Sequence, residues 1–274
     1  MTEAPIPTPE SNPNEPIWRA LLMGTDQRYA RAHGWLRHLP GSPRCKMCSA
    51  PFGGVARPLM HFLGRDRWAK NPTYCGACFQ LLSTMHGGAE IEATFLFADV
   101  RGSTAMAERI SPTEFRRQLD RFYDASARIV VERDGIVDKF VGDEIVAMFI
   151  PALAHEAHAR QAIEAGLAIL EATGHGDPAG PWLPVGAGVH SGVAFVGAVG
   201  EPPVTELTAL GDVVNTAARL ASAADAGELL VSDAAIDAAD WPTADLEPRS
   251  LELKGKREPT SVRVARVPIA AIRP

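Results

Sequence analysis

Four charged side chains interrupt one apolar stretch of the chain, DKFVGDEIVAMF at residues 138–149. The four are Asp138, Lys139, Asp143 and Glu144. The β-branched and aromatic residues around them predict two strands, and Gly142-Asp143 between the two runs is typical of a tight hairpin turn. Charges beside such a turn are accessible to a ligand, so this hairpin is a candidate binding element.

A second acidic position, Asp99, lies at the C-terminal end of the predicted strand IEATFLFADV and precedes Asp143 by 44 residues. From this strand onward the predicted order is strand, helix, strand, hairpin strand, helix and strand, which is typical of a ferredoxin-like split βαβ core in an α+β fold. That topology places the strand after Asp143 antiparallel beside the strand that ends at Asp99. We therefore expect the two carboxylates to meet at one sheet edge, with no basic residue alternating between them.

Two carboxylates this close repel each other unless a cation lies between them. Mg²⁺ and Mn²⁺ prefer oxygen ligands and commonly bind one or two carboxylates together with phosphate oxygens. The segment after Asp99, with Gly102, Ser103 and Thr104, predicts a turn into a helix N-terminus, which favours phosphate. The simpler alternative is that Asp99 caps this helix and Asp143 only serves the turn. The two aspartates together favour a site for metal and phosphate.

Further elements must position these side chains. Apolar residues at helical spacing predict an amphipathic helix from Pro112, and an Ala-rich helix is expected at about 153–172. Residues 184–200, PVGAGVHSGVAFVGAVG, predict two Val/Gly-rich strands. A helix over about 212–224 would carry Asn215 and Arg219 on one face near its N-terminus, because they are four residues apart.

Five segments, in register, resemble the catalytic domain of the class III nucleotide cyclases over roughly residues 90–267. They are FLFADVRGST, DKFVGDEIVAMF, AGVHSGVAFVGAVG, ALGDVVNTAARL and LELKGKREP. The resemblance implies a homodimer with two active sites at the subunit interface. It also implies conversion of ATP or GTP to the cyclic 3′,5′-monophosphate and pyrophosphate. We assign residues 89–270 to this catalytic domain.

The resemblance implies specific roles for charged and polar residues. Asp99 and Asp143, with the Val100 backbone, would bind two Mg²⁺ or Mn²⁺ ions. Lys139 and Thr208 match the two positions that recognise the purine, and a second subunit is expected to supply Thr208 to the hairpin.

Three further positions match family residues that contact the rest of the nucleotide. Asn215 and Arg219 match the pair that orients the ribose and stabilises the transition state, and they too would come from a second subunit. Lys254 resembles a lysine that contacts the terminal phosphates, with Lys256 as the less favoured choice. The remaining charges of the hairpin, Asp138 and Glu144, are expected to be solvated or structural.

These assignments favour an adenylate cyclase acting by in-line attack of the ribose 3′-oxygen on the α-phosphorus. Family members that use GTP tend to carry an acidic residue where Lys139 stands, so Lys139 favours ATP. The alternatives are a guanylate cyclase, a catalytically silent nucleotide-binding module, and an enzyme of the diguanylate-cyclase or polymerase-palm type. Degenerate relatives lose an aspartate, the asparagine or the arginine, all of which are present. His190 is expected to be a satisfied core histidine at a strand end.

The N-terminal quarter has a different composition. Cys45-x2-Cys48 and Cys75-x2-Cys78 are two knuckle-like pairs, which in a cytoplasmic protein favour a metal over disulfides. Four thiolates suit structural Zn²⁺, and a [2Fe–2S] cluster is the alternative. We assign residues 17–88 to a regulatory unit that the metal would stabilise. Residues 79–90 are expected to be the linker that joins it, through Gly87-Gly88, to the cyclase domain.

Charge and hydropathy exclude other classes. Residues 17–88 carry ten Lys/Arg against two Asp/Glu, but the whole chain has a formal net charge of −6, so nucleic-acid binding is not expected. Nothing approaches the ~20 apolar residues of a membrane span, and the N-terminus lacks a secretory pattern. We therefore expect a cytoplasmic protein without a membrane partner. Residues 1–16, rich in proline, are expected to be a disordered tail.

Overall fold

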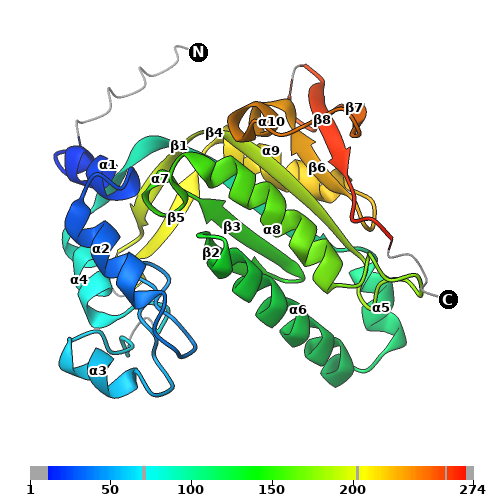
Figure 1. The fold of residues 1–274 in the computed structure, drawn as a ribbon. Helices are drawn as coiled ribbons and strands as arrows, with labels where there is room; N and C mark the ends of the chain where they lie inside the picture. Colours follow the sequence, from blue (N-terminus) through cyan, green and yellow to red (C-terminus); the bar gives the residue numbers. More distant parts are fainter. Residues whose placement is uncertain (1–11, 70–71, 202–203, 257, 270–274) are drawn as a thin grey trace, which may run out of the picture.

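The computed structural model describes residues 12–69, 72–201, 204–256 and 258–269. The strands of these residues form one eight-stranded sheet in the order β2-β3-β1-β4-β6-β8-β7, with β5 pairing on β4 (Figure 1). The strands are β1 (Gly87–Val100), β2 (Ile136–Val141), β3 (Glu144–Phe149), β4 (Val185–Val199), β5 (Glu206–Leu210), β6 (Leu229–Ser232), β7 (Glu247–Leu251) and β8 (Thr260–Ala265).

Helices cover both faces of this sheet. The helices of the described residues are α1 (Glu15–Leu22), α2 (Gln27–Leu36), α3 (Arg57–Phe62), α4 (Gly76–Thr84), α5 (Ser103–Arg109), α6 (Pro112–Glu132), α7 (Pro151–Ala154), the 3₁₀ helix η1 (His155–Ala157), α8 (His158–Ala172), α9 (Asp212–Ala223) and α10 (Asp233–Ala239). Among the described helices, none is both long and apolar enough to span a bilayer.

The centre of the sheet has the predicted split βαβ arrangement. Strand β1 lies antiparallel between β3 and β4, and its register places Asp99 opposite Glu144. Because β3 follows β2 through Gly142-Asp143, with Val141 paired to Glu144, the connection is the two-residue turn expected from sequence. Gly142 has a φ of 63°, a left-handed conformation that glycine adopts without steric cost.

Helix α6 begins at the predicted proline. The Ser111 hydroxyl accepts the backbone N–H of Glu114 at 3.2 Å, and Pro112 occupies the first helical position, where no N–H is needed. Its apolar face, with Phe122, Ile129 and Val130, is buried.

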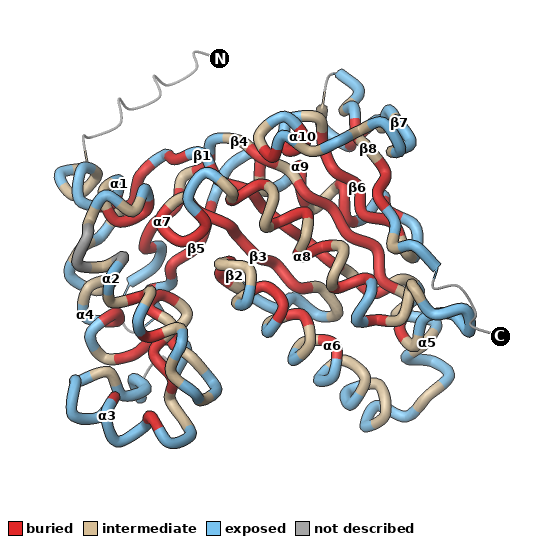
Figure 2. Tube along the Cα trace, in the orientation of Figure 1, coloured by how far each residue is buried: buried red, intermediate tan, exposed pale blue. Residues whose placement is uncertain are grey.

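The central strands β1, β3 and β4 are mostly buried (Figure 2). Their alternate residues belong to two hydrophobic clusters, which therefore lie on opposite faces of the sheet. One cluster joins β1, β3 and β4 to α6, α8 and α10, with Leu96, Ile145 and Phe149 in its interior. The other joins the alternate residues of the same strands to α9, including Phe95 and Ala217. This second cluster continues without interruption into α1 and the cysteine-bearing segment.

Three expectations about chain organisation are wrong. Gly87 and Gly88 are not a linker, because they begin β1 and pair with β4. Residues 185–199 form one long strand rather than two. Helix α1 begins at Glu15, inside the expected tail of residues 1–16, of which residues 1–11 lie outside the described part of the chain.

The cysteine segment does not have a hydrophobic core of its own. Trp18, Tyr74 and Leu82 are in the same buried cluster as Ile91 and Phe95 of β1. The division into units at residues 17–88 and 89–270 therefore stays a prediction about function, since packing continues across the boundary.

Candidate active site

Asp99 and Asp143 meet at one edge of the sheet, as the topology predicted. The Val100 N–H donates to the backbone carbonyl of Asp143 at 3.3 Å, and β1 places Asp99 beside that turn. Burial raises the pKa of Asp99, Arg101 opposes that rise, and the neighbouring Asp143 carboxylate adds to it. These two carboxylates, with the Val100 backbone, are the oxygen donors available to a divalent cation.

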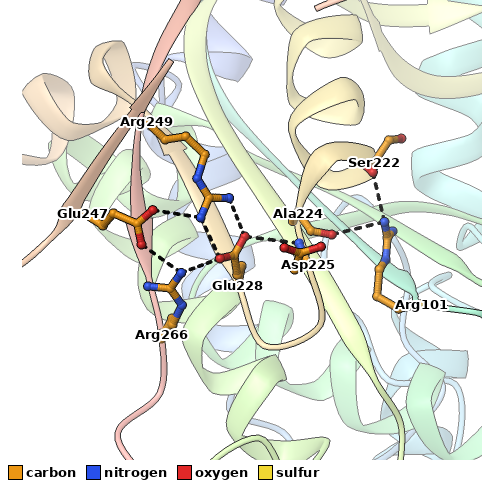
Figure 3. A network of polar contacts seen from close by, with 8 residues as sticks. All are labelled: Arg101, Ser222, Ala224, Asp225, Glu228, Glu247, Arg249 and Arg266. Carbon is orange, nitrogen blue, oxygen red and sulfur yellow. Dashed lines mark hydrogen bonds and ion pairs between the residues drawn. The ribbon is translucent and has the colours of Figure 1, made fainter. Parts of the chain in front are cut away.

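A basic residue does lie at this edge, contrary to expectation. Arg101 forms an ion pair with the Asp99 carboxylate. Its Nη1 donates to the carbonyls of Ser222 at 3.1 Å and Ala224 at 3.4 Å (Figure 3). Arg101 follows the end of β1 directly and is only two residues from Asp99, so the sequence itself placed a cation beside this carboxylate. Arg101 thus joins the carboxylate edge to the C-terminal end of α9.

Glu144, which was expected to be solvated or structural, is not freely solvated. It is half-buried, and burial together with Asp99 and Asp143 raises its pKa to about 7. Three carboxyl groups thus converge at this edge.

Lys139 and Thr208 contact each other within one chain, with Nζ and Oγ1 3.4 Å apart. The expectation that a second subunit supplies Thr208 to Lys139 is therefore wrong. Asp138 holds both residues, because its Oδ2 accepts from Thr208 Oγ1 at 3.0 Å and lies 3.3 Å from Lys139 Nζ. Its side chain is 7% exposed, so Asp138 is structural and not solvated.

A β-bulge presents Asp138 in this way. Strand β2 pairs Val137 with Ala147 and Lys139 with Val146, so Asp138 is the extra residue between them. Bulges break strand alternation and redirect side chains, and they are frequent beside active sites. Neighbouring residues 138 and 139 can therefore both reach Thr208.

The contact with Thr208 also requires a strongly curved sheet. Through Val146 and Phe97, Lys139 lies level with Gly188 of β4, whereas Thr208 pairs with Gly197, nine residues further along that strand. In a flat sheet, Lys139 and Thr208 would be separated along the strand direction by nine residues, at about 3.3 Å per residue. The far end of β4 and its partner β5 must therefore bend back toward β2.

Helix α9 carries Asn215 and Arg219. It begins after Gly211, whose φ of 144° favours glycine, and buries Val213, Ala217 and Leu220 while Asn215 is exposed. The helix packs closely on β4 at Gly188. A Cβ at this position would lie 2.3 Å from the Ala221 nitrogen, so the absence of a side chain permits the close approach.

The loop with Lys254 and Lys256 lies against this helix. Lys256 forms an ion pair with Asp212, the first residue of α9, whereas Lys254 is exposed. A Cβ built on Gly255 would be 3.5 Å from the Arg219 guanidinium. The geometry thus places the loop beside Arg219, but it does not distinguish Lys254 from Lys256 as the lysine that would contact the terminal phosphates.

Two other expectations concern single features near these residues. His190 lies within β4 rather than at its end, and it is satisfied as expected, since Nδ1 is 2.7 Å from Ser232 Oγ. Burial lowers its pKa to about 4. Gly102, with a φ of 69°, precedes α5, so Ser103 and Thr104 open a helix as predicted.

The four cysteines converge in the N-terminal segment. Their Sγ atoms lie within 4.8 Å of one another, and all four residues are buried. The Cys48 and Cys75 sulfurs are 3.7 Å apart. The first pair lies in a short turn, in which the Ser49 N–H donates to the Cys45 carbonyl. The second pair lies at the N-terminus of α4, where the Phe79 N–H donates to the Cys75 carbonyl. This all-sulfur set could hold one four-coordinate metal ion.

Residues 89–265 match the sequence profile of the family described as "Adenylate and Guanylate cyclase catalytic domain". The chain belongs to this family. The resemblance to class III cyclases is thereby confirmed, together with the α+β fold. The roles assigned to individual site residues stay predictions.

Curated relatives support the same family. Adenylate cyclase 1 of Rhizobium meliloti (strain 1021) is 35% identical over 134 residues, covering 47% of this chain and 20% of that protein. Adenylate cyclase of Anabaena cylindrica is 28% identical over 183 residues, covering 62% of this chain and 36% of that protein. The chain thus matches only about a fifth to a third of the length of these relatives.

Solved structures share the fold. The guanylyl cyclase Cya2 superposes with a TM-score of 0.59 at 24% identity, covering 68% of this chain and 96% of that chain. The adenylyl cyclase CyaB from P. aeruginosa superposes with a TM-score of 0.56 at 25% identity, covering 65% of this chain and 95% of that chain. Both purine specificities thus occur among similar structures.

Proposed function

We propose that this cyclase uses ATP and releases 3′,5′-cyclic AMP and pyrophosphate. The observation that carries the choice of purine is the contact between Lys139 and Thr208. Because the Thr208 hydroxyl donates to Asp138, its oxygen keeps a lone pair for a ligand, while Lys139 offers N–H donors. One donor and one acceptor match adenine N1 and its exocyclic amine. Guanine instead presents a carbonyl where adenine has its amine, and its N1–H and 2-amine both require acceptors.

The carboxylate edge fits divalent cations. Asp99 and Asp143 are close enough for burial and mutual repulsion to raise the pKa of Asp99, and an oxygen-preferring cation relieves that repulsion. Asp99, Asp143 and the Val100 carbonyl would hold two Mg²⁺ or Mn²⁺ ions. When bound, such ions polarise phosphate oxygens and neutralise developing charge.

The remaining residues orient the nucleotide for in-line attack of the ribose 3′-oxygen on the α-phosphorus. Asn215 would hold the ribose, and the Arg219 guanidinium would stabilise charge on the phosphate, for which its planar fork is suited. Lys254 and the turn of Gly102, Ser103 and Thr104 would contact phosphate oxygens. Positioning and charge stabilisation account for catalysis, since none of these groups serves as a dedicated base.

A second copy of the chain would complete each site. Apolar side chains beside the candidate residues are exposed in the single chain, with Val193 63%, Val141 54% and Leu210 52% exposed. Exposed apolar residues clustered around polar ones are typical of interfaces. Lys139 and Thr208 would face the metal-binding aspartates of the partner, together with Asn215 and Arg219 from their own chain.

The cysteine cluster would hold Zn²⁺. A tetrahedral ion with Zn–S bonds of about 2.3 Å requires sulfurs roughly 3.8 Å apart. The 3.7 Å between Cys48 and Cys75 agrees with this value. A [2Fe–2S] cluster would need room between the cysteine pairs for two irons and two sulfides. The Sγ atoms all lie within 4.8 Å of one another, which leaves little room for such a cluster. Arg65 lies near enough to these thiols for them to raise its pKa against the effect of its burial, so it can offset thiolate charge.

Steady-state kinetics with ATP and GTP, in Mn²⁺ or Mg²⁺, test the choice of purine. We expect cyclic AMP as the main product and a higher kcat/KM for ATP. Replacing the donor by an acceptor, Lys139→Glu, should lower that preference about tenfold or more, while Arg128→Ala on the exposed face of α6 leaves it unchanged. A preference for GTP in the wild type would make the protein a guanylate cyclase, and no product from either nucleotide would indicate a silent module.

A further inference from the structure

Lys46 lies between the first two cysteines, yet its side chain reaches the candidate purine site. It is only 4% exposed, and its Nζ donates to three oxygens at 2.7 Å each: the Asp138 carboxylate, the Asp138 carbonyl and the Leu207 carbonyl. An ammonium group has three N–H donors, so each donor has an acceptor.

These acceptors lie on two strands that do not pair with each other. Asp138 is in β2 and Leu207 in β5, and in each case the next residue is a member of the candidate purine pair, Lys139 or Thr208. Backbone ladder bonds therefore cannot fix the position of one residue of the pair relative to the other. Lys46 supplies direct bonds across this gap.

Tyr74 makes a second bond to β5. Its hydroxyl accepts the Leu207 N–H at 2.9 Å, and the residue is fully buried next to Cys75. The two knuckles are joined behind these contacts, because the Lys46 N–H donates to the Thr73 carbonyl at 2.9 Å. Both knuckles thus hold Leu207, one at its carbonyl and one at its N–H.

The Asp138 carboxylate carries the contact onward to the site. One oxygen accepts from Lys46, while the other accepts from Thr208 and lies 3.3 Å from Lys139. Without Lys46 the bulged Asp138 would lose its buried countercharge and could rotate toward the more exposed Lys139. The lone pair that Thr208 presents to a purine would then change direction.

We propose that Lys46 is a positioning residue that sets the preference for ATP over GTP by holding Asp138 and β5, and through them Lys139 and Thr208. This inference rests on the proposed purine site. It adds a function for the cysteine segment, which fixes the geometry of a site to which it contributes no ligand-contacting residue.

The test compares two ion pairs between the cysteine segment and the region of β2, Lys46–Asp138 and Arg37–Asp134. Lys46→Met removes the ammonium but keeps an unbranched chain of similar length. Arg37→Met is the matched control, because Arg37 also pairs with an aspartate near β2, Asp134, but does not reach the purine pair. Tyr74→Phe removes only one hydroxyl and provides a milder variant if Lys46→Met does not fold.

The readout is the ratio of kcat/KM for ATP to that for GTP, with kcat and KM separated. We expect the ratio to fall about tenfold in Lys46→Met, mainly through a higher KM for ATP, and less in Tyr74→Phe. Arg37→Met should keep the wild-type ratio even if its thermal stability falls. An unchanged ratio in Lys46→Met, or an equal change in Arg37→Met, would overturn the proposal, as would an unchanged ratio in Tyr74→Phe if only that variant folds.

Equilibrium binding of fluorescent ATP and GTP analogues to the same proteins separates this inference from catalysis. If the wild type binds nucleotide but forms no cyclic product, the proposed activity fails, while a lower ATP-to-GTP affinity ratio in Lys46→Met still supports the positioning function. An equal ratio in the two proteins refutes that function. Failure of the wild type to bind either analogue refutes both.

Discussion

At the candidate purine site, Asp138 is held by Lys46, a partner that the local sequence does not specify. Asp99 was predictable because it ends an apolar strand, and Lys139 because it interrupts one. The placement of Asp138 depends on a bulge, and that of Lys46 on tertiary packing of a segment over 90 residues away in sequence. Composition and spacing contain no signal for such contacts.

Buried His33 makes stability depend on pH. Its Nε2 is 3.0 Å from Ser49 Oγ, and burial followed by the charge of Arg37 lowers its pKa to about 4. Because the unfolded chain binds the proton first, near pH 6.5, stability present at pH 7 is lost as the pH falls toward 4. By pH 5 this loss is about 2 kcal/mol.

Urea unfolding at pH 7 and pH 5 measures this loss. The difference in unfolding free energy between the two pH values should be smaller by about 2 kcal/mol in His33→Gln than in the wild type. His38→Gln removes an exposed histidine of the same segment and should leave the difference unchanged. Equal losses in His33→Gln and the wild type would show that His33 does not titrate in this range.

At the scale of elements, the strand pairing near Asp99 followed from sequence, whereas the curvature of the sheet did not. Alternating apolar residues and the Gly142-Asp143 turn fix the register of β1, β2 and β3 locally. The contact of Lys139 with Thr208 depends on the bend of β4, a long glycine-rich strand that its composition suggested was two. The sequence therefore did not show that β2 and β5, which do not pair with each other, approach each other within one chain.

The position of helix α9 depends on Gly188. Gly188→Ala would place a methyl group 2.3 Å from the Ala221 nitrogen, so α9 must move away from β4. We expect a loss of about 1–3 kcal/mol in unfolding free energy and at least about tenfold in kcat, because Arg219 moves with the helix. Gly34→Ala in α2 has open space and is the control. A fully active and stable Gly188→Ala protein would contradict this packing.

For the whole molecule, an ionic network and a shared core connect distant segments. The buried Glu228 carboxylate accepts from Arg249 and Arg266, which also pair with Glu247, and its Oε2 accepts the Asp225 N–H just beyond α9 (Figure 3). These hydrogen bonds, with that of Arg249 first, lower the pKa of Glu228 to about 2. The network thus ties the end of α9 to β6, β7 and β8.

The shared core predicts the effect of metal removal. Because the cysteines lie in one buried cluster with Ile91 and Phe95, extraction of Zn²⁺ should destabilise the cyclase sheet as well. We expect one zinc per chain by elemental analysis, and a single calorimetric transition that shifts down by roughly 10 °C or more on chelation. A separate transition for the sheet, unmoved by the chelator, would show that the segments unfold independently.

The most direct measurement of the central claim is cyclic AMP formation by the wild type, by Asp143→Asn, by Arg219→Ala and by a mixture of the two variants. We expect an active wild type, two inactive variants and partial activity in the mixture, since one site of a mixed dimer then keeps Asp143 from one chain and Arg219 from the other. Wild-type activity in Asp143→Asn would contradict the metal-assisted site. Lack of recovery in mixtures shown to exchange subunits would contradict a site shared between chains.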